Sequence, residues 1–213
     1  MEKDIAIMMA DLTGYTAMTE AHGGASAAKM VGKYMELVNS AMMGTARLHQ
    51  RIGDQVVIVA DQAHDILETA QRLNKLTSDE HHFLSIHAGL HYGSVFIEGD
   101  NFFGSTINIA ARIMNIAQRG QILCSQNFLN EVKEVAQTIC IGKHKLKNVP
   151  GDVELFLITE KSKTDVFIDP VCHMQIDCSK SDLALNYNNI DYHFCSTHCR
   201  DRFEAGPKEF IGN

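Results

Sequence analysis

The sequence predicts an α+β fold with a ferredoxin-like layout, followed by a small cysteine-rich ββα module at the C-terminal end. The first observation is that apolar runs of strand length alternate with segments whose apolar residues recur every three to four positions. The second is that four of the six cysteines lie from Cys172 onward. A chain of 213 residues can hold one sizeable core and one smaller module.

The first strand is predicted from the apolar run IAIMMA at residues 5–10. Asp11 closes this run and a Thr-Gly turn follows, as is typical of a buried strand that ends in a tight turn. Between residues 26 and 43 the apolar positions have helical spacing, so we expect a long amphipathic helix.

A hairpin and a second helix should follow. Residues 53–54 are a Gly-Asp pair between two strand-like segments, which predicts a turn with Asp54 at a strand end. The apolar spacing predicts a helix over residues 63–76. The stretch 83–99 has the length and β-branched content of two strands, with bends at its glycines, Gly89 and Gly93.

A helix that opens at Gly104 carries two polar side chains suited to binding phosphate. Asn108 and Arg112 are four residues apart, so both leave the same face of the helix. The guanidinium is a planar fork of donors, and the amide adds a neutral contact to a ribose or phosphate oxygen. The alternative is that Arg112 simply projects into solvent, as most helical arginines do.

The rest of the first domain is predicted as a short strand at 121–125, a helix at 127–135 and strands within 137–149 and 153–159. This order of elements predicts a largely antiparallel sheet with its helices on one face. A charged, polar stretch then marks a change in composition. We therefore predict three parts, which are a domain at 1–159, a linker at 160–167 and a second domain at 168–213.

Charge and composition narrow the class of protein. The formal net charge is -7 and the basic residues are scattered, which argues against a nucleic-acid partner. The apolar run near the N-terminus is too short for a signal peptide or a membrane span, and Asp11 interrupts it. We expect a cytoplasmic protein with no membrane partner, in which closely spaced thiols bind metal rather than form disulfides.

Asp11 and Asp54 are candidate metal ligands. Their carboxylates converge if the first strand lies beside the hairpin, and hard oxygen donors suit Mg²⁺ or Mn²⁺. Two such ions could activate a hydroxyl and neutralise a leaving phosphate group. The alternative is that both aspartates only stabilise turns.

The cysteine-rich module is predicted to contain a hairpin whose turn is Asn188–Asn189. A helix that starts after this hairpin would stack Cys195 and Cys199 on one face, with Cys172 arriving from a preceding loop. Three thiolates suit Zn²⁺ or Cu⁺. The candidate fourth ligands are His173, His193 and His198.

The module could sense the metal as a regulatory signal. Alternatively, the metal only stabilises a domain that is too small to fold alone. The other cysteines are expected to be bystanders, and Cys124 and Cys140 fall in apolar strand-like segments where cysteine acts as a small hydrophobe. Cys178 is the third cysteine expected to be a bystander.

Five separated motifs carry a resemblance to a known family. They are DLTGYTAMTE, IGDQVVIVA, HAGLHYGSV, FFGSTINIAARIMNIAQRGQILCS and KLKNVPGDVELFLI, and in this order they resemble the class III adenylate and guanylate cyclase catalytic domain over about residues 4–158. The resemblance implies that Asp11 and Asp54 hold two Mg²⁺ or Mn²⁺ ions per active site. It also implies that Asn108 orients the ribose and Arg112 stabilises the transition state. Family members are head-to-tail homodimers in which one protomer supplies the metal pair and the other the Asn and Arg.

The same resemblance implies positions that read the purine base, usually Lys and Asp for ATP or Glu and Cys for GTP. The matching residues here are Gln50 and Asn101, two neutral amides that can pair with a purine edge. The nearest candidate for a phosphate-contacting lysine is Lys147. The implied reaction is conversion of ATP to 3′,5′-cyclic AMP and pyrophosphate, with a guanylate cyclase or an inactive homologue as alternatives.

The segments DPVC and YHFCS, with the final cysteine, resemble a YHS domain, which is akin to TRASH metal-binding modules, over about residues 168–211. An enzyme with an appended, regulatory metal-binding domain is the function that the two resemblances imply. The alternative is a non-catalytic cyclase-like domain that dimerises or binds nucleotide and serves a metal sensor or a metal-trafficking module.

Overall fold

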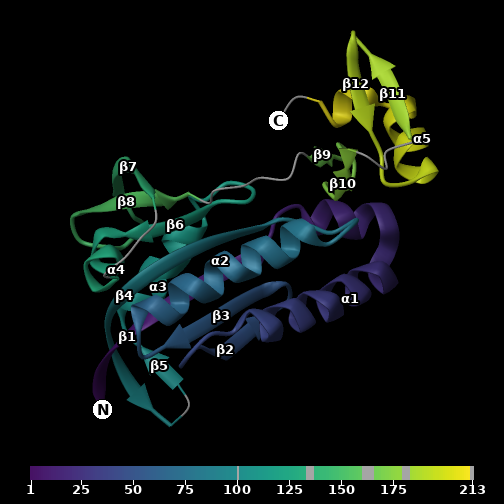
Figure 1. The fold of residues 1–213 in the computed structure, drawn as a ribbon. Helices are drawn as coiled ribbons and strands as arrows, with labels where there is room; N and C mark the ends of the chain where they lie inside the picture. The colour runs from purple at the N-terminus through teal and green to yellow at the C-terminus, as the bar shows by residue number, and fades with distance from the viewer. Residues whose placement is uncertain (100, 133–136, 160–165, 179–182, 212–213) are drawn as a thin grey trace.

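The computed structural model describes residues 1–99, 101–132, 137–159, 166–178 and 183–211, and consists of a large mixed domain with a small module at one end (Figure 1). In chain order the large domain contains β1 (Glu2–Leu12), α1 (Tyr15–Ala41), β2 (Arg47–Ile52), β3 (Gln55–Ala60), α2 (Ala63–Asp79), β4 (Ile86–Glu98), β5 (Asn101–Phe103), α3 (Ser105–Met114), β6 (Ile122–Ser125), α4 (Gln126–Glu131), β7 (Thr138–Lys145) and β8 (Asp152–Ile158). The small module contains β9 (Val166–Ile168), β10 (Gln175–Asp177), β11 (Ala184–Tyr187), β12 (Ile190–His193), α5 (Thr197–Ala205) and the 3₁₀ helix η2 (Pro207–Glu209).

One sheet organises the large domain. Its strand order is β2-β3-β1-β4-β6-β8-β7, with β5 paired to β4. Within the described residues, β4 and β6 pair in parallel and the other neighbours are antiparallel. The predicted α+β class is therefore confirmed.

Helices cover both faces of this sheet. In the central strand β1, Ala6, Met8 and Ala10 pack into the core formed with α1, α2 and α4. The alternate residues of β1 pack into a second core with α3. The expectation that all helices share one face is wrong for α3, because a strand buried on both faces is apolar throughout and does not show which face each helix covers.

The stretch predicted as two strands is the single long strand β4. Gly89 and Gly93 do not bend it; they let α3 lie close against it. A Cβ atom at Gly89 would come 2.3 Å from the backbone nitrogen of Met114, and one at Gly93 would come 3.1 Å from Oγ1 of Thr106. Glycine in a strand often marks such a close approach of another backbone.

Helix α1 starts earlier than the apolar spacing predicts, and it contains an interruption at Gly23. This residue has φ 78° and ψ 167°, so α1 consists of two helical segments that meet at a kink. Glycine tolerates this positive φ, whereas other residues are strained there. The first segment, from Tyr15 to His22, therefore has its own direction.

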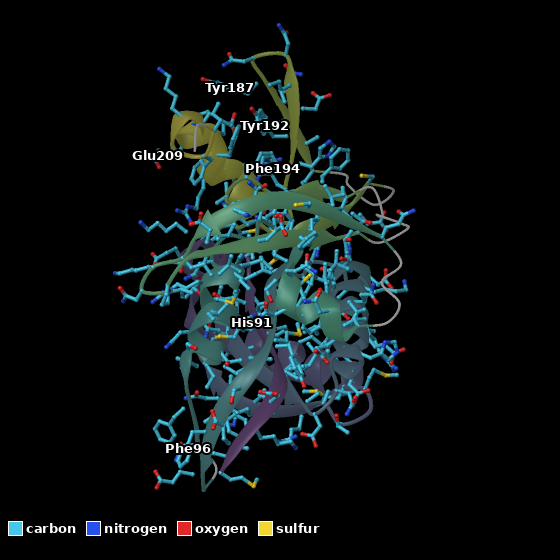
Figure 2. All side chains as sticks on the ribbon, turned by 90° about the vertical axis from the view of Figure 1, so that its left-hand side faces the viewer. His91, Phe96, Tyr187, Tyr192, Phe194 and Glu209 are labelled. Carbon is cyan, nitrogen blue, oxygen red and sulfur yellow. The ribbon has the colours of Figure 1, made fainter. Side chains whose placement is uncertain are left out.

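A buried histidine lies in the middle of β4, where Figure 2 labels it. The Nδ1 atom of His91 is 2.7 Å from Oγ of Ser125, and the same hydroxyl accepts a hydrogen bond from the backbone of Phe128 at the start of α4. Burial lowers the pKa of His91 to about 4. This histidine is therefore neutral at physiological pH.

The small module has the predicted ββα part. Strands β11 and β12 pair around Asn188 (φ 53°) and Asn189 (φ 63°), which is the left-handed geometry of a two-residue hairpin turn. Phe203 of α5 is fully buried against the hairpin, with ring centroids 4.8 Å from Tyr192 and 5.3 Å from Phe194, both labelled in Figure 2. An additional two-stranded sheet, β9–β10, was not predicted.

The small module is packed against the large domain, at one end of α1 and α2 (Figure 1). The backbone of Gln175 donates to the carbonyl of Phe83 over 2.8 Å, and its side chain donates to the carbonyl of Thr77 over 3.1 Å. Residues 160–165 of the predicted linker lie outside the described residues, as do residues 133–135 of the predicted helix at 127–135. The predicted domain boundaries stay predictions.

Candidate functional site

A pocket of about 300 Å³ lies at the carboxyl end of β1. The pairing of Ala10 with Val56 places the end of β1 beside the start of β3, and thus beside the β2–β3 turn that carries Asp54. The sheet thereby brings Asp11 and Asp54 into one pocket. The lining residues are Asp11, Leu12, Thr13, Gly14, Tyr15, Thr16, Asp54 and His87.

The two carboxyl groups influence each other. Burial is the main reason that the pKa of Asp54 rises to about 7, and a hydrogen bond and the negative charge of Asp11 add to it. The pKa of the fully buried Tyr34 is also raised, first by burial and then by the charges of these two aspartates. Its hydroxyl has no hydrogen-bond partner within the described part of the chain. Two close carboxylates in a half-buried pocket fit a divalent cation with hard oxygen ligands.

The turn between β1 and α1 also lines the pocket. The hydroxyl of Thr13 is 3.0 Å from Nδ1 of His87, whose pKa is lowered mainly by burial. Gly14 has φ 90° and precedes the first turn of α1. The pocket therefore combines acidic groups with the amino end of a long helix.

Asn108 and Arg112 both lie on α3, as predicted, but not in this pocket. Asn108 is exposed and Arg112 is half-buried. The Nε atom of Arg112 is buried without a hydrogen-bond partner among the residues that the structure describes. A single chain therefore does not bring these two residues together with Asp11 and Asp54, and their roles stay predictions.

The other predicted substrate contacts are exposed. Gln50 lies on the edge strand β2 and Asn101 on β5, and the adjacent rings of His49 and Phe102 stack with centroids 4.4 Å apart. These two strands are thus neighbours at one edge of the domain. Lys147 lies in the β7–β8 connection and does not line the pocket.

A second cluster, here called the thiol cluster, consists of His22, Cys172, Cys195 and Cys199. The sulfur of Cys195 is 3.4 Å from that of Cys172 and 3.6 Å from that of Cys199. The Nε2 atom of His22 is 3.5 Å from the sulfurs of both Cys195 and Cys199. Three sulfurs and one imidazole nitrogen are a donor set that suits Zn²⁺ or Cu⁺.

None of the three histidines proposed from the sequence as fourth ligand belongs to this cluster. His173 contacts Arg119 instead, through its carbonyl at 2.9 Å and its Nδ1 at 3.0 Å. The ring of His193 stacks on Phe167 at 3.5 Å, and the ring of His198 is 6.5 Å from that of His22. Sequence analysis missed His22 because it lies in the large domain, 173 residues from Cys195.

A buried aspartate holds the two cysteine-bearing loops in place. Asp169 accepts hydrogen bonds from the backbones of Val171 (2.8 Å), Cys172 (3.3 Å) and Cys195 (2.8 Å). It was not singled out from the sequence, although it opens the DPVC segment.

The three remaining cysteines lie outside the thiol cluster. Cys124 is buried in β6, which fits the predicted role of a small hydrophobe, and burial raises its pKa to about 12. Cys140 is exposed, in contrast to the prediction, because β7 is an edge strand of the sheet. Cys178 is also exposed.

Comparison with known families identifies both domains. The model of the adenylate and guanylate cyclase catalytic domain matches residues 1–160, and that of the YHS domain matches residues 167–213. The chain is 24 % identical over 161 residues to the pH-sensitive adenylate cyclase MT1302 of Mycobacterium tuberculosis, covering 73 % of this chain and 41 % of that protein. A stretch of 52 residues is 36 % identical to a copper-transporting P-type ATPase of Rhizobium leguminosarum, which is 24 % of this chain and 6 % of that protein.

The fold agrees with this assignment. A solved adenylate cyclase from Trypanosoma brucei superposes with a TM-score of 0.69 at 17 % identity, covering 82 % of this chain and 94 % of that one. By contrast, the aligned part of this chain spans less than half the length of the adenylate cyclases from Mycobacterium tuberculosis, Streptomyces griseus and Streptomyces coelicolor. None of the helices in the described ranges is long and apolar enough to cross a bilayer. The chain belongs to the family of adenylate and guanylate cyclase catalytic domains and carries a YHS domain at its C-terminal end.

Proposed function

We propose that the chain converts ATP to 3′,5′-cyclic AMP and pyrophosphate at a site shared by two copies of itself. The observation that carries this proposal is the convergence of Asp11 and Asp54 in one pocket beside the β1–α1 turn. Membership of the cyclase family supports it.

Each residue would have a distinct role. Asp11 and Asp54 would hold two Mg²⁺ or Mn²⁺ ions, which supply activation of the ribose 3′ hydroxyl and neutralisation of the leaving pyrophosphate. The turn at Thr13 and Gly14 precedes the amino end of α1, which would favour a negatively charged triphosphate.

The other half of the site would come from a second copy in a head-to-tail homodimer. The partner's Asn108 would position the ribose, and the partner's Arg112 would stabilise charge on the transferred phosphoryl group. Two observations support this arrangement: α3 and the acidic pocket are separate within one chain, and Nε of Arg112 is buried without a partner in the part of the chain described. In a twofold dimer the same contacts would form twice.

Base recognition would involve Gln50 and Asn101, with Lys147 as a candidate phosphate contact. Two neutral amides accept either adenine or guanine, so GTP is the alternative substrate. The same amides favour a second candidate function, in which the cyclase domain binds nucleotide without turnover and serves a metal sensor or metal-trafficking module.

The YHS domain would bind one soft ion, Zn²⁺ or Cu⁺, through Cys172, Cys195 and Cys199 and would regulate the cyclase domain. We propose the division into a cyclase domain at 1–159, a linker at 160–167 and a YHS domain at 168–213. The short distances among the three sulfurs support metal binding.

The test is cyclase activity of the full chain with Mn²⁺ and either ATP or GTP, measured as cyclic nucleotide formed. Wild type should give a cyclic product, and Asp54→Asn should lower the rate at least about a thousandfold, because the pocket then loses one of its two anionic ligands. The matched control is Asp61→Asn. Asp61 directly follows β3 and has a partly exposed carboxylate that pairs with Lys3 at 2.9 Å, so its loss should change the rate less than about twofold. Nucleotide binding without any cyclic product would overturn the enzyme and support the second candidate.

A further inference from the structure

The thiol cluster contains residues from both domains. Three sulfurs belong to the YHS domain, whereas His22 closes the first segment of α1 in the cyclase domain. A metal held only by the YHS domain would leave this imidazole without a role. Its position therefore needs an explanation beyond the metal binding proposed above.

The distances agree with tetrahedral coordination by all four groups. Metal–sulfur bonds of about 2.3 Å and a metal–nitrogen bond of about 2.0 Å place tetrahedral sulfurs about 3.8 Å apart and sulfur and nitrogen about 3.5 Å apart. The structure has sulfur pairs at 3.4 and 3.6 Å and both measured sulfur–nitrogen pairs at 3.5 Å. All four donor atoms lie within 4.8 Å of one another.

The local backbone favours this arrangement. The kink at Gly23 directly follows His22, so the segment Tyr15–His22 can incline toward the YHS domain independently of the rest of α1. On the other side, Asp169 holds the backbones of Cys172 and Cys195. The donors are thus presented by two separately supported segments.

Two short stretches of chain connect the thiol cluster to the acidic pocket. His22 is at the end of the helical segment that begins directly after the pocket turn, and Cys172 is followed by His173. The side chain of His173 covers Gly14 so closely that a Cβ atom there would come 2.5 Å from the Cβ of His173. A change at the thiol cluster can therefore move two segments that border the pocket.

We propose that His22, Cys172, Cys195 and Cys199 form one tetrahedral site for Zn²⁺ or Cu⁺ that bridges the two domains, so that metal binding fixes the YHS domain to the start of α1. This inference rests on the metal-binding part of the proposed function and adds the ligand from the cyclase domain. It makes metal occupancy a link between the domains rather than a staple within one of them.

The test is titration of the reduced, metal-free full chain with Co²⁺, whose visible absorption reports coordination number and ligand type. Wild type should bind one equivalent with the intense bands of a tetrahedral site. His22→Ala should bind at least about tenfold more weakly with altered bands, since loss of even an outer partner of a ligand costs about 10–100-fold. His22→Cys keeps a fourth donor and should restore tight tetrahedral binding.

The matched control is His198→Ala, because His198 is the neighbouring histidine that lies outside the cluster. Its affinity should stay within about twofold of wild type. Equal affinities and spectra for wild type and His22→Ala would overturn the bridging site while leaving a metal-binding YHS domain. Absence of binding to wild type with Co²⁺, Zn²⁺ and Cu⁺ would instead overturn the metal-binding part of the proposed function, and the bridging site with it.

A second measurement tests the link between the domains. Hydrogen exchange of residues 15–22 should slow when Zn²⁺ is added to wild type, because the imidazole then holds this segment. The same addition should leave exchange unchanged in His22→Ala. Equal slowing in both proteins would contradict the proposal, since the metal would then act without His22.

Discussion

The acidic pocket and the thiol cluster lie at opposite ends of the first segment of α1, and they are completed in different ways. Asp11 and Asp54 meet within one domain, yet the pocket lacks Asn108 and Arg112 of the same chain. The thiol cluster has four donors from one chain, yet they come from two domains. Under the two proposals above, the acidic site crosses a chain boundary and the thiol cluster crosses a domain boundary.

The largest expected effect is a loss of kcat on substitution of Arg112, which would enter the acidic site from the second copy. Arg112→Ala should lower kcat about a thousandfold, as is typical when a guanidinium that stabilises a transferring phosphoryl group is lost. Arg72→Ala is the matched control, because Arg72 lies on α2 and its guanidinium makes an exposed contact of 3.3 Å with the sulfur of Met43. Steady-state kinetics with Mn²⁺-ATP measures both. An unchanged kcat in Arg112→Ala would contradict the proposed role of Arg112 in the active site.

Metal-dependent stability tests the thiol cluster. Zn²⁺ present at a thousand times its dissociation constant should stabilise the folded protein by about 4 kcal/mol. Cys172→Ser should lose most of this gain, whereas Cys178→Ser should keep it, because Cys178 is exposed and outside the cluster. Urea unfolding with and without Zn²⁺ provides the measurement. If Cys172→Ser is stabilised as strongly as wild type, the three-sulfur site is incorrect.

The pH dependence of the free energy of unfolding should report on His91, which lies in the core of the cyclase domain and outside both sites. The pKa of His91 is about 4 in the folded protein and about 6.5 when unfolded, so between these values the unfolded chain binds more protons. Stability should therefore fall as pH drops from about 6.5 to 4, by up to about 3 kcal/mol from this residue. His91→Gln should remove that portion of the pH dependence.

The control for this measurement is His64→Gln, since His64 is an exposed histidine on α2. It should leave the acid sensitivity as in wild type. Urea unfolding at pH 4.5 and pH 7 gives the comparison. Equal pH dependence of wild type and His91→Gln would show that other groups control acid unfolding.

The smallest expected effect is a partial recovery of activity on mixing two inactive variants. Asp54→Asn and Arg112→Ala should each be nearly inactive alone. If chains exchange freely, half of the dimers contain one of each, and each such dimer has one intact site out of two. The mixture should then reach about one quarter of wild-type activity. No recovery after verified exchange would mean that the acidic pocket and α3 do not cooperate between chains.

Local sequence patterns were sufficient to predict most helices and strands of the large domain. The apolar run before Asp11 and the Gly-Asp turn at residues 53–54 predicted adjacent strand ends, and the structure joins them in one pocket. The Asn188–Asn189 turn was also confirmed, because only a few residue types accept two successive positive φ values.

Other features depend on tertiary contacts that no local pattern records. Gly89 was interpreted as a bend, whereas it lies beneath α3. The glycines at residues 23–24 concealed the first segment of α1, since they interrupt its apolar spacing. His22 could not be assigned to the thiol cluster, because a single histidine gives no signal of its partners far along the chain.

The position of Gly89 has a consequence for the proposed role of Arg112. The backbone of α3 rests on this residue, so a methyl group introduced there would push the helix outward from the sheet. The guanidinium of Arg112 would then be displaced relative to the site of the second copy. A misplacement of about 1 Å can slow a reaction about a hundredfold. The missing side chain at Gly89 of β4 would thus determine the position of α3, and with it the position that the guanidinium of Arg112 can take.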